Sequence, residues 1–419
     1  MKAEIIAVGS ELLTPDRLDT NSLFLTAQLN ALGVEVVRKT IVGDDQGLML
    51  DAFRDALDRV QIVIASGGLG PTEDDLTRET VAELLGRRLV RDDNIVRAIE
   101  ARFRSFNRVM PEKNVRQAMV PEGAEPLDNP RGTAPGLWLE ERDRMIALLP
   151  GPPRELEPMF REQVLPRLER RVSGVRLHRR ELRVTGLGES HVDQLAAPIY
   201  TRYPQVLTTI LASPGEVQIH LRYWTADAAQ AQATLDEIER ALDLALTDRI
   251  FSRDGSPLEV AVARELIRQH ATISAAESCT GGLFAQRLTS FPGSSAYFLG
   301  GVVCYSNEMK TAWAGVPPDL IAAKGAVSPE VAVALAEGIR RRVGSTLGIG
   351  ITGIAGPGGG SEEKPVGTVH VALAGPNGVR ERALRLPGDR EMVRLQSSQA
   401  ALDLVRLHFL YNGSVLPQR

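Results

Sequence analysis

Residues 274–282 read SAAESCTGG, and this stretch decides the fold of the C-terminal part of the chain. An apolar run ends at Ser278 and Cys279, and Gly281 and Gly282 open the next segment, which is typical of a buried strand leading into a helix. Open α/β sheets gather reactive side chains where strands end at helix N-termini, because backbone N–H groups there stabilise an oxyanion or a phosphate. The stretch therefore predicts an α/β sheet with a nucleophile at its edge.

The rest of the C-terminal part alternates apolar runs with helical patterns. Ser256, Pro257 and Glu259 predict the start of a helix that ends near His270, with Ser256 as its N-cap. We expect four strands, at ATISAAE (271–277), FLGGVVCY (298–305), TLGIGIT (346–352) and GTVHVALA (367–374).

The N-terminal part shows a βαβαβ pattern, with strands expected at 2–8, 34–42 and 61–66 and helices at 21–32 and 48–60. Because such units have parallel strands, the loops at Gly9, at Gly43–Asp45 and at Gly67–Asp75 should emerge at one edge of the sheet. Residues 121–158 are rich in proline and glycine, and we expect ordered loops there that fold back over that edge.

Length and composition indicate several folded domains. The 419 residues exceed one ordinary core, so we expect three domains, at 1–170, 171–252 and 253–419, the middle one a small α+β module. No signal segment or membrane span is expected, and two cysteines are too few for a disulfide framework, which predicts a cytoplasmic protein. A net charge of -4 argues against nucleic acid as the main ligand.

Three N-terminal loops carry glycines and carboxylates: GSELL with Glu11, GDD with Asp44, and GGLGPTEDDLT with Asp74 and Asp75. Glycines let backbone amides approach phosphate oxygens, and carboxylates are hard ligands for a divalent ion. The pattern predicts a site for a phosphate ester or pyrophosphate. The alternative is that Asp74 and Asp75 only occupy a helix N-terminus.

A second set of residues predicts hydrolysis of a carboxamide. Ser278 is a candidate nucleophile, and Lys310 is its candidate base if burial lowers the pKa of the lysine; the alternative is that Lys310 is a surface residue. Cys279 is a competing nucleophile, and its base would be one of the histidines of this part, His270, His370 and His408.

The loop GIAGPGGGSEEKPVG, which contains Gly356, together with Arg390 and Arg394, predicts a grip on a ribose phosphate. No metal-ligand spacing of cysteine and histidine is present near these residues, so we expect no metal at this second site.

The chain resembles the competence/damage-inducible CinA family. The motifs that carry the resemblance are AVGSELL, DTNS, VGDD, SGGLGPTEDDLT, KNVRQA, NPRGTAPG and LPGPPRE in the N-terminal part, and ESCTGG, PGSSAYF, CYSNEMK, GAVSPE, GITGIAGPGGG and KPVGTV in the C-terminal part. The resemblance implies a three-layer molybdopterin-binding-like domain, a KH-type module and a C-terminal α/β deamidase domain. The implied activities are metal-dependent ADP-ribose pyrophosphatase and nicotinamide mononucleotide deamidase, which belong to nucleotide salvage in the pyridine nucleotide cycle.

The resemblance also implies which residues form the two sites. In the C-terminal domain the implied catalytic residues are Ser278, Lys310, Tyr305 and Thr352, and the substrate-binding residues are Gly281, Gly282, Ser294, Ser295, Gly356, Arg390 and Arg394. In the N-terminal domain the implied substrate-binding residues are Glu11, Asn21, Gly67, Gly68, Gly70, Thr72, Lys113, Asn114 and Gly132, and the implied metal ligands are Asp44, Asp74 and Asp75. The chain departs from the family at Thr14 and Pro15, where relatives often have a glycine.

Two alternatives to this function stay open. The N-terminal fold also binds molybdopterin in other proteins, so a pterin-handling enzyme is one alternative. The other is a nucleic-acid-binding competence scaffold that uses an arginine-rich stretch (Arg167, Arg170, Arg171, Arg176, Arg179, Arg180 and Arg183). Gly186-Leu187-Gly188-Glu189 lacks the GxxG spacing of an RNA-binding KH loop, so we expect no RNA contact there. We expect nucleotides as ligands, no membrane contact, and a homodimer.

Overall fold

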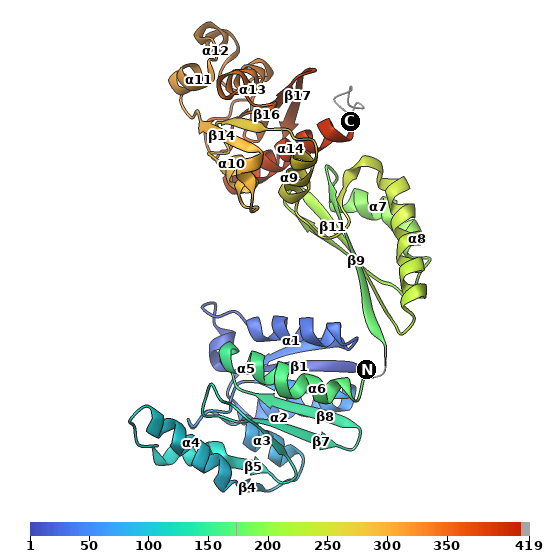
Figure 1. Cartoon of the computed structure of the whole chain (residues 1–419), viewed down its shortest axis with the longest axis vertical. Coiled ribbons are helices and arrows are strands. Elements are labelled where there is room, and N and C mark those ends of the chain that lie inside the picture. Colours follow the sequence, from blue (N-terminus) through green and yellow to red (C-terminus); the bar gives the residue numbers. More distant parts are fainter. Residues whose placement is uncertain (173, 412–419) are drawn as a thin grey trace. The chain divides into compact units, whose positions relative to one another are not determined.

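A computed structural model describes residues 1–172 and 174–411. The chain divides into two compact units. The first is formed by Met1–His178 with Tyr223–Gln232, and the second by Arg179–Arg222 with the chain from Ala233 onward. Figure 1 shows the elements of each unit.

The first unit is built on a six-stranded sheet of order β2-β1-β3-β8-β7-β6. Strands β2, β1, β3 and β8 run parallel, and β7 and β6 are added antiparallel at one side. The strands are β1 (Lys2–Val8), β2 (Glu35–Val42), β3 (Ile62–Ser66), β6 (Glu125–Leu127), β7 (Gly136–Glu141) and β8 (Arg144–Leu149). A separate two-stranded sheet pairs β4 (Leu89–Arg91) with β5 (Met119–Pro121).

Helices cover both faces of this sheet, which gives three layers (Figure 1). One face packs on α1 (Thr20–Ala31), α5 (Pro153–Met159) and α6 (Leu165–Glu169), through side chains such as Ile5 and Ile64. The other face packs on α2 (Gln46–Arg59) and α3 (Thr77–Leu84), through side chains such as Ile6 and Val63. Helix α4 (Asp93–Ser105) lies beyond α3 in the chain. The βαβαβ prediction and the fold class are confirmed.

The expectation of loops over 121–158 is wrong, because this region supplies part of the sheet. Strands β7 and β8 form an antiparallel hairpin, with Leu139 opposite Ile146, and both side chains are fully buried. Prolines and glycines before β7 and after β8 mark the turns of this region and not its whole length.

A four-stranded sheet of order β10-β11-β9-β12 forms the middle module. Its pairs β10–β11 and β12–β9 are antiparallel, and α7 and α8 bury apolar residues such as Val192 and Ile238. The elements are β9 (Arg176–Thr185), α7 (Glu189–Tyr200), β10 (Leu207–Ser213), β11 (Glu216–Thr225), α8 (Ala228–Leu246) and β12 (Ile250–Ser252). The sequence patterns did not predict β10.

The arginine-rich stretch before and within β9 is largely neutralised by neighbouring acids. Arg171 bonds Glu140 at 2.6 Å, and Arg183 contacts Glu216 at 3.0 Å. Arg180 contacts Glu239 at 3.0 Å. Paired arginines of this kind leave less free positive charge for a nucleic-acid backbone than the sequence count indicates.

The C-terminal sheet has the order β14-β13-β15-β16-β17. Strands β14, β13 and β15 are parallel, and β16 and β17 are antiparallel to their neighbours. The strands are β13 (Ile273–Glu277), β14 (Phe298–Val303), β15 (Leu347–Gly353), β16 (Thr368–Gly375) and β17 (Gly378–Arg385). The helices are α9 (Leu258–Arg268), α10 (Leu283–Thr289), α11 (Asn307–Ala314), α12 (Pro318–Lys324), α13 (Pro329–Val343) and α14 (Arg390–Leu410). Helix α9 begins at Leu258 with Pro257 as its N-cap, so the predicted cap at Ser256 is wrong.

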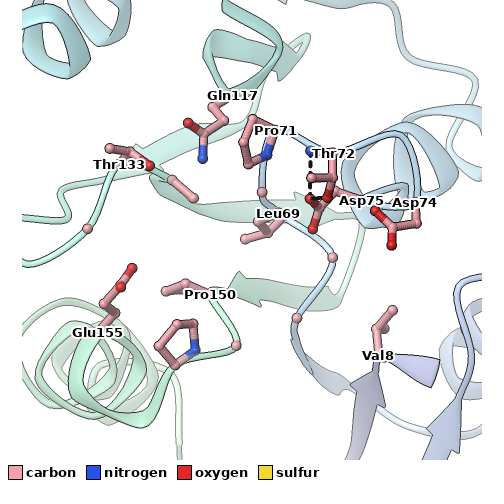
Figure 2. Close-up of a pocket in the computed structure, with 18 of the residues that line it drawn as sticks. Val8, Leu69, Pro71, Thr72, Asp74, Asp75, Gln117, Thr133, Pro150 and Glu155 are labelled. Atoms are coloured by element: carbon pink, nitrogen blue, oxygen red, sulfur yellow. Dashed lines mark hydrogen bonds between the residues drawn. The ribbon is translucent and has the colours of Figure 1, made fainter. Parts of the chain in front are cut away.

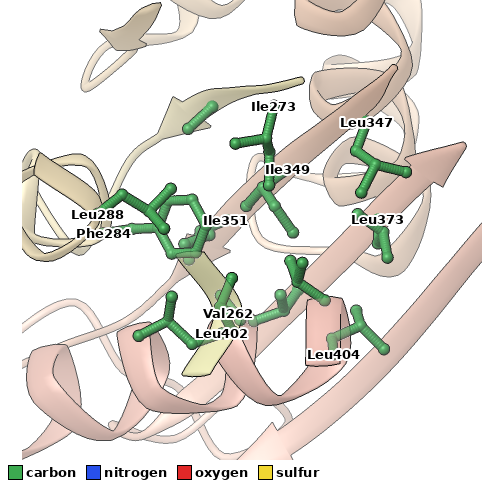
Figure 3. Close-up of a cluster of buried hydrophobic side chains, with 14 of the residues drawn as sticks. Val262, Ile273, Phe284, Leu288, Leu347, Ile349, Ile351, Leu373, Leu402 and Leu404 are labelled. Atoms are coloured by element: carbon green, nitrogen blue, oxygen red, sulfur yellow. The ribbon is translucent and has the colours of Figure 1, made fainter. Parts of the chain in front are cut away.

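The two faces of β15 explain why TLGIGIT alternates glycine with isoleucine. Ile349 and Ile351 join the core under α9, α10 and α14 (Figure 3). On the opposite face, Gly348 and Gly350 let α13 lie directly on the sheet, since a Cβ at Gly350 would stand 2.3 Å from the backbone oxygen of Ala332. Backbone contact at this distance leaves no room for a side chain.

This close packing makes a stability prediction. Gly350→Ala should lower the free energy of unfolding of the C-terminal domain by about 1–3 kcal/mol, because α13 must move away from β15. Gly358→Ala is the matched control, since a Cβ there meets nothing within 4 Å. Chemical denaturation followed by circular dichroism measures both, and equal stability of the two variants would contradict this account of the packing.

Candidate functional site

The first candidate site is a cavity of about 490 Å³ at the carboxyl ends of β1, β2, β3 and β8 (Figure 2). The predicted loops do meet at this edge of the parallel sheet, because Val8 pairs with Val42 and Ala7 with Ser66 at the ends of the strands. The cavity is lined by Val8, Gly9, Glu11, Asp44, Gly67–Thr72, Asp74, Asp75, Arg102, Gln117, Arg131–Ala134, Pro150–Pro152, Arg154 and Glu155.

The loop from Gly67 to Asp75 requires glycine where it passes the start of α3. Gly68 has a φ of +65°, and a Cβ on it would lie 2.1 Å from the hydroxyl oxygen of Thr77. The loop is closed by Asp75, whose carboxylate accepts hydrogen bonds from the backbone N–H of Thr72 at 2.9 Å and from the Thr72 hydroxyl. Thr72 therefore stabilises the loop and also lines the cavity.

The carboxylates at this edge are partly engaged in the local structure. Asp44 accepts a hydrogen bond from the backbone N–H of Ser10 at 2.8 Å, which ties the β2 loop to the β1 loop. Asp74 is exposed and lines the cavity. Glu155 is 8% exposed and accepts from Asn129 at 2.9 Å.

The carboxylate oxygens at this edge are better suited to a metal ion that binds together with a phosphate substrate than to one that the protein holds alone. Within residues 1–172 and 174–411, no three side chains of His, Cys, Asp or Glu are grouped to hold a metal ion. Mg²⁺ is commonly held by one or two carboxylates together with substrate phosphates, and the cavity offers Asp44, Asp74 and Asp75 for that purpose. The prediction of these three residues as ligands stays a prediction.

Other residues implied by the resemblance lie at different distances from the cavity. Asn21 donates to the carbonyl of Gly151 at 2.7 Å and so supports the wall. Asn114 is buried and donates to Gln117 at 3.0 Å, and it is Gln117 that lines the cavity. Lys113 is exposed and is not among the lining residues, so the structure does not bring it to the site.

Sequence reasoning missed three arginines that line the cavity: Arg102, Arg131 and Arg154. Arg102 donates to the carbonyl of Pro130 at 2.6 Å, which joins α4 to the loop that contains Gly132. Guanidinium groups bind phosphate through two parallel hydrogen bonds. Two of them could have been found from the sequence, because Arg131 and Arg154 lie within the motifs NPRGTAPG and LPGPPRE.

The second candidate site is the edge of the C-terminal sheet where β13, β14 and β15 end. Glu277 pairs with Val303 on one side and with Ile351 on the other, so the residues that follow these strands meet. Ser278 is 8% exposed, and its backbone N–H donates to the carbonyl of Ile351 at 3.0 Å. The predicted placement of a serine at a strand-to-helix turn is what the structure has.

Lys310 is a buried residue, so the alternative of a surface lysine is wrong. Its side chain extends from α11, is 2% exposed, and donates to the carbonyl of Tyr305 at 3.3 Å. Burial lowers the pKa of the Lys310 amine, and nearby Cys304, Cys279 and Glu308 oppose that shift. A lysine in such surroundings gives up its proton more readily than one in water.

Cys279 has the opposite character. It is 4% exposed, and burial raises the pKa of its thiol to about 12. The histidines are poorly placed to serve it: His270 lies before β13, at the far edge of the sheet, and His408 packs against Gly375 at that same far edge. His370 is paired with Glu381 at 2.8 Å. The geometry favours Ser278 over Cys279.

The backbone amides at the N-terminus of α10 already have hydrogen-bond acceptors. This corrects the expectation that the amides around Gly281 and Gly282 stabilise an oxyanion or a phosphate. The buried carboxylate of Glu277 accepts hydrogen bonds from the backbone N–H groups of Gly282, Phe284 and Ala285 at 2.9–3.1 Å. The N–H of Gly281 donates to the carbonyl of Ser278 at 3.0 Å. These amides are therefore not free for an oxyanion or a phosphate.

Three further predicted residues, Arg390, Arg394 and Thr352, lie at the same edge of the sheet as Ser278. Arg390 donates to the Tyr305 hydroxyl at 2.6 Å and to the carbonyl of Gly356 at 2.8 Å, so α14, the β14 end and the glycine loop meet. Arg394 donates to the carbonyl of Thr280 at 2.9 Å, close to Ser278. Thr352 is buried and donates to the carbonyl of Ala326 at 2.7 Å.

Ser294 and Ser295 are the exception. They form a short 3₁₀ helix just before β14 begins at Phe298, which pairs with Ile273 at the start of β13. They therefore lie at the edge opposite Ser278, and the structure does not bring them to the second candidate site. Residues that precede β14 and residues that follow β13 lie at opposite edges because the two strands are parallel.

No helix among residues 1–172 and 174–411 has the length and apolar composition that crossing a bilayer requires.

Comparison with known proteins gives three domain matches in order. The probable molybdopterin binding domain matches residues 4–170, the damage-inducible protein CinA KH domain matches 179–252, and the CinA C-terminal domain matches 255–409.

Relatives are similar over nearly the whole length. The CinA-like protein of Koribacter versatilis is 54% identical over 410 residues, which cover 97% of this chain and 99% of that protein. The putative competence-damage inducible protein of Moorella thermoacetica is 46% identical, with 97% and 98% covered. A solved structure, competence/damage inducible protein CihA from Agrobacterium tumefaciens, is 39% identical and covers 36% of this chain and 96% of its own, with a TM-score of 0.35. The similarity to the Koribacter and Moorella proteins over nearly the whole length shows that the chain belongs to the CinA family. Its three domains are a molybdopterin-binding-like domain, a KH domain and a CinA C-terminal domain.

Proposed function

We propose that the C-terminal domain hydrolyses nicotinamide mononucleotide to nicotinate mononucleotide and ammonia. The observation that carries this proposal is the buried Lys310, whose pKa is lowered by burial, at the same sheet edge as Ser278. Amide hydrolysis needs a nucleophile and a base that can accept its proton, and we assign these roles to Ser278 and Lys310. Membership of the CinA family supports the same assignment.

In the proposed reaction, the neutral amine of Lys310 accepts the proton of the Ser278 hydroxyl as its oxygen attacks the carboxamide carbon. The tetrahedral intermediate then breaks its C–N bond, and Lys310 returns the proton to the leaving ammonia. Water, deprotonated by the same amine, then attacks the ester carbon. The C–O bond to Ser278 breaks, and Lys310 returns the proton to the serine oxygen. Thr352, at the end of β15, and Tyr305, which follows β14, lie at the same edge of the sheet.

The phosphate of the nucleotide would lie near Arg390 and Arg394. Both side chains are anchored to backbone carbonyls of the site, Arg390 to Gly356 and Arg394 to Thr280, so their charge is held in place before the substrate binds. Fixed guanidinium groups lose less rotational freedom on binding than mobile ones.

Substitutions of Ser278 and Lys310 test the proposed reaction. Ser278→Ala and Lys310→Met should each lower kcat by several orders of magnitude, and the double variant should lose little more, because residues that act as one unit are not additive. Since the amine must be neutral, kcat/KM of the wild type should rise with pH through an apparent pKa below the roughly 10.4 of a free lysine. Ammonia release at steady state measures both effects.

Cys279→Ala is the matched control for this test. A thiol with a pKa of about 12 carries almost no thiolate near neutral pH, so the variant should retain most of the activity. Loss of activity in Cys279→Ala together with retention in Ser278→Ala would reject the serine mechanism.

We propose further that the N-terminal cavity hydrolyses the pyrophosphate of ADP-ribose with a divalent metal ion, which would be held by Asp44, Asp74 and Asp75. When bound, the ion would polarise a phosphoryl group towards attack by water. The glycine loop and the arginines Arg102 and Arg131 support the proposal, because together they supply backbone and guanidinium donors for two phosphates.

A charge-removing double variant, Asp74→Asn with Asp75→Asn, tests this second activity. It keeps side-chain size and should abolish metal-dependent formation of AMP and ribose 5-phosphate while deamidation continues. Asp92→Asn is the control, because Asp92 caps α4 through a bond to the Asn94 N–H at 2.8 Å and is not a cavity residue. Unchanged cleavage by the double variant at equal metal concentration would reject Asp74 and Asp75 as metal ligands.

A further inference from the structure

Arg78 is a buried cation behind the glycine loop of the N-terminal cavity. It is the second residue of α3 and is 1% exposed, and its side chain is the largest of those fully buried in the described residues. Burial lowers the pKa of its guanidinium group. A buried charge of this kind is costly unless it is paired, so its surroundings are informative.

The guanidinium of Arg78 is incompletely paired. Its closest acid, Glu79, stands 3.8 Å away and is bound more closely by Arg116, at 2.8 Å. The Nε and Nη2 atoms of Arg78 have no hydrogen-bond partner among the described residues. Its hydrogen bond goes from Nη1 to the carbonyl oxygen of Leu69, in the glycine loop, at 3.1 Å.

This bond completes a series in which α3 holds three successive loop carbonyls. The Thr77 hydroxyl donates to the carbonyl of Gly67 at 2.9 Å, and the Thr77 backbone N–H donates to that of Gly68 at 3.2 Å. Arg78 then binds the carbonyl of Leu69. All three acceptors are cavity-lining residues.

The orientation of the carbonyls determines that of the amides. In a planar trans peptide, the C=O of one residue and the N–H of the next point to opposite sides. Three carbonyls turned towards α3 therefore turn the N–H groups of Gly68, Leu69 and Gly70 away from it. None of these three N–H groups donates a hydrogen bond within the described chain. Successive free N–H groups in a glycine loop form a concave site for an anion.

We propose that Arg78 is the positioning residue of a phosphate cradle. It fixes the last of the three loop carbonyls, so that the loop amides face the ligand, and it places a buried positive charge behind them. That charge matters because the cavity wall also carries the carboxylates of Glu11, Asp44, Asp74, Asp75 and Glu155, which repel a phosphate. The inference rests on the proposed pyrophosphatase function of the same site and assigns the group that orients its phosphate donors.

Binding of inorganic pyrophosphate to the full-length chain, in EDTA and measured by calorimetry, tests the proposal without requiring turnover. Arg78→Met keeps most of the side-chain volume and should weaken binding by about tenfold or more, the effect of losing a charged hydrogen-bonding group. Binding of neutral adenosine should change less than that of pyrophosphate. The unfolding temperature, measured on the same samples, reports whether the variant is folded.

Chemical rescue separates positioning from general support of the fold. Arg78→Ala removes the guanidinium and leaves its space, so added methylguanidinium should restore pyrophosphate binding. A matched pair at Thr77 tests the neighbouring carbonyl: Thr77→Val removes the hydroxyl donor at nearly constant shape and should weaken binding, while Thr77→Ser should not. This pair decides the matter if the Arg78 variants do not fold, because equal affinity of Thr77→Val and Thr77→Ser would overturn the cradle.

The outcomes distinguish this inference from the proposed function. Folded Arg78→Met that binds pyrophosphate like the wild type overturns the role of Arg78, even where the chain cleaves ADP-ribose. Arg78-dependent pyrophosphate binding by a chain that cleaves no ADP-ribose supports the cradle and rejects the pyrophosphatase. A wild-type chain that binds no pyrophosphate in EDTA overturns the cradle, and the metal-dependent cleavage of ADP-ribose is then decided by its own assay.

Discussion

Parallel strand pairing is the constraint on which both candidate sites depend. In each sheet, adjacent parallel strands bring their carboxyl ends to one edge, so residues far apart in the sequence meet without any direct attraction between them. Glu277 pairs with Val303 and Ile351, and this register alone places Ser278 beside the segments that carry Lys310 and Thr352. The glycines of β15 allow α13 to lie directly on one face of the sheet.

Buried cations give the two edges their chemistry. Lys310 is placed where water cannot solvate its charge, which lowers the pKa of the amine and favours its neutral form more than in a lysine exposed to water. Arg78 stays charged because a guanidinium does not lose its proton in proteins, so the same burial produces a fixed positive charge instead of a base. One type of environment thus supports proton transfer at one site and anion binding at the other, according to the side chain that occupies it.

The sequence predicted the elements whose patterns are local and missed those that depend on tertiary contacts. The βαβαβ order, the turn at Ser278 and the loops of the N-terminal edge follow from periodicity and glycine placement. The β7–β8 hairpin was missed because its strands are buried on both faces and lie between proline-rich turns. Ser294 and Ser295 lie at the edge opposite Ser278, because β14 pairs in parallel with β13. Glu277 accepts hydrogen bonds from the α10 amides, and residue order does not show such side-chain partners. Arg78 was missed because an arginine in a helix is expected at the surface.

The most direct test of the account is product identification with the purified full-length chain. It would be incubated separately with nicotinamide mononucleotide, and with ADP-ribose plus Mg²⁺ or Mn²⁺, and the products would be resolved by chromatography and mass spectrometry. The account predicts nicotinate mononucleotide with equimolar ammonia from the first, and AMP with ribose 5-phosphate from the second. Recovery of both substrates unchanged, at enzyme concentrations where the protein is folded, would contradict it.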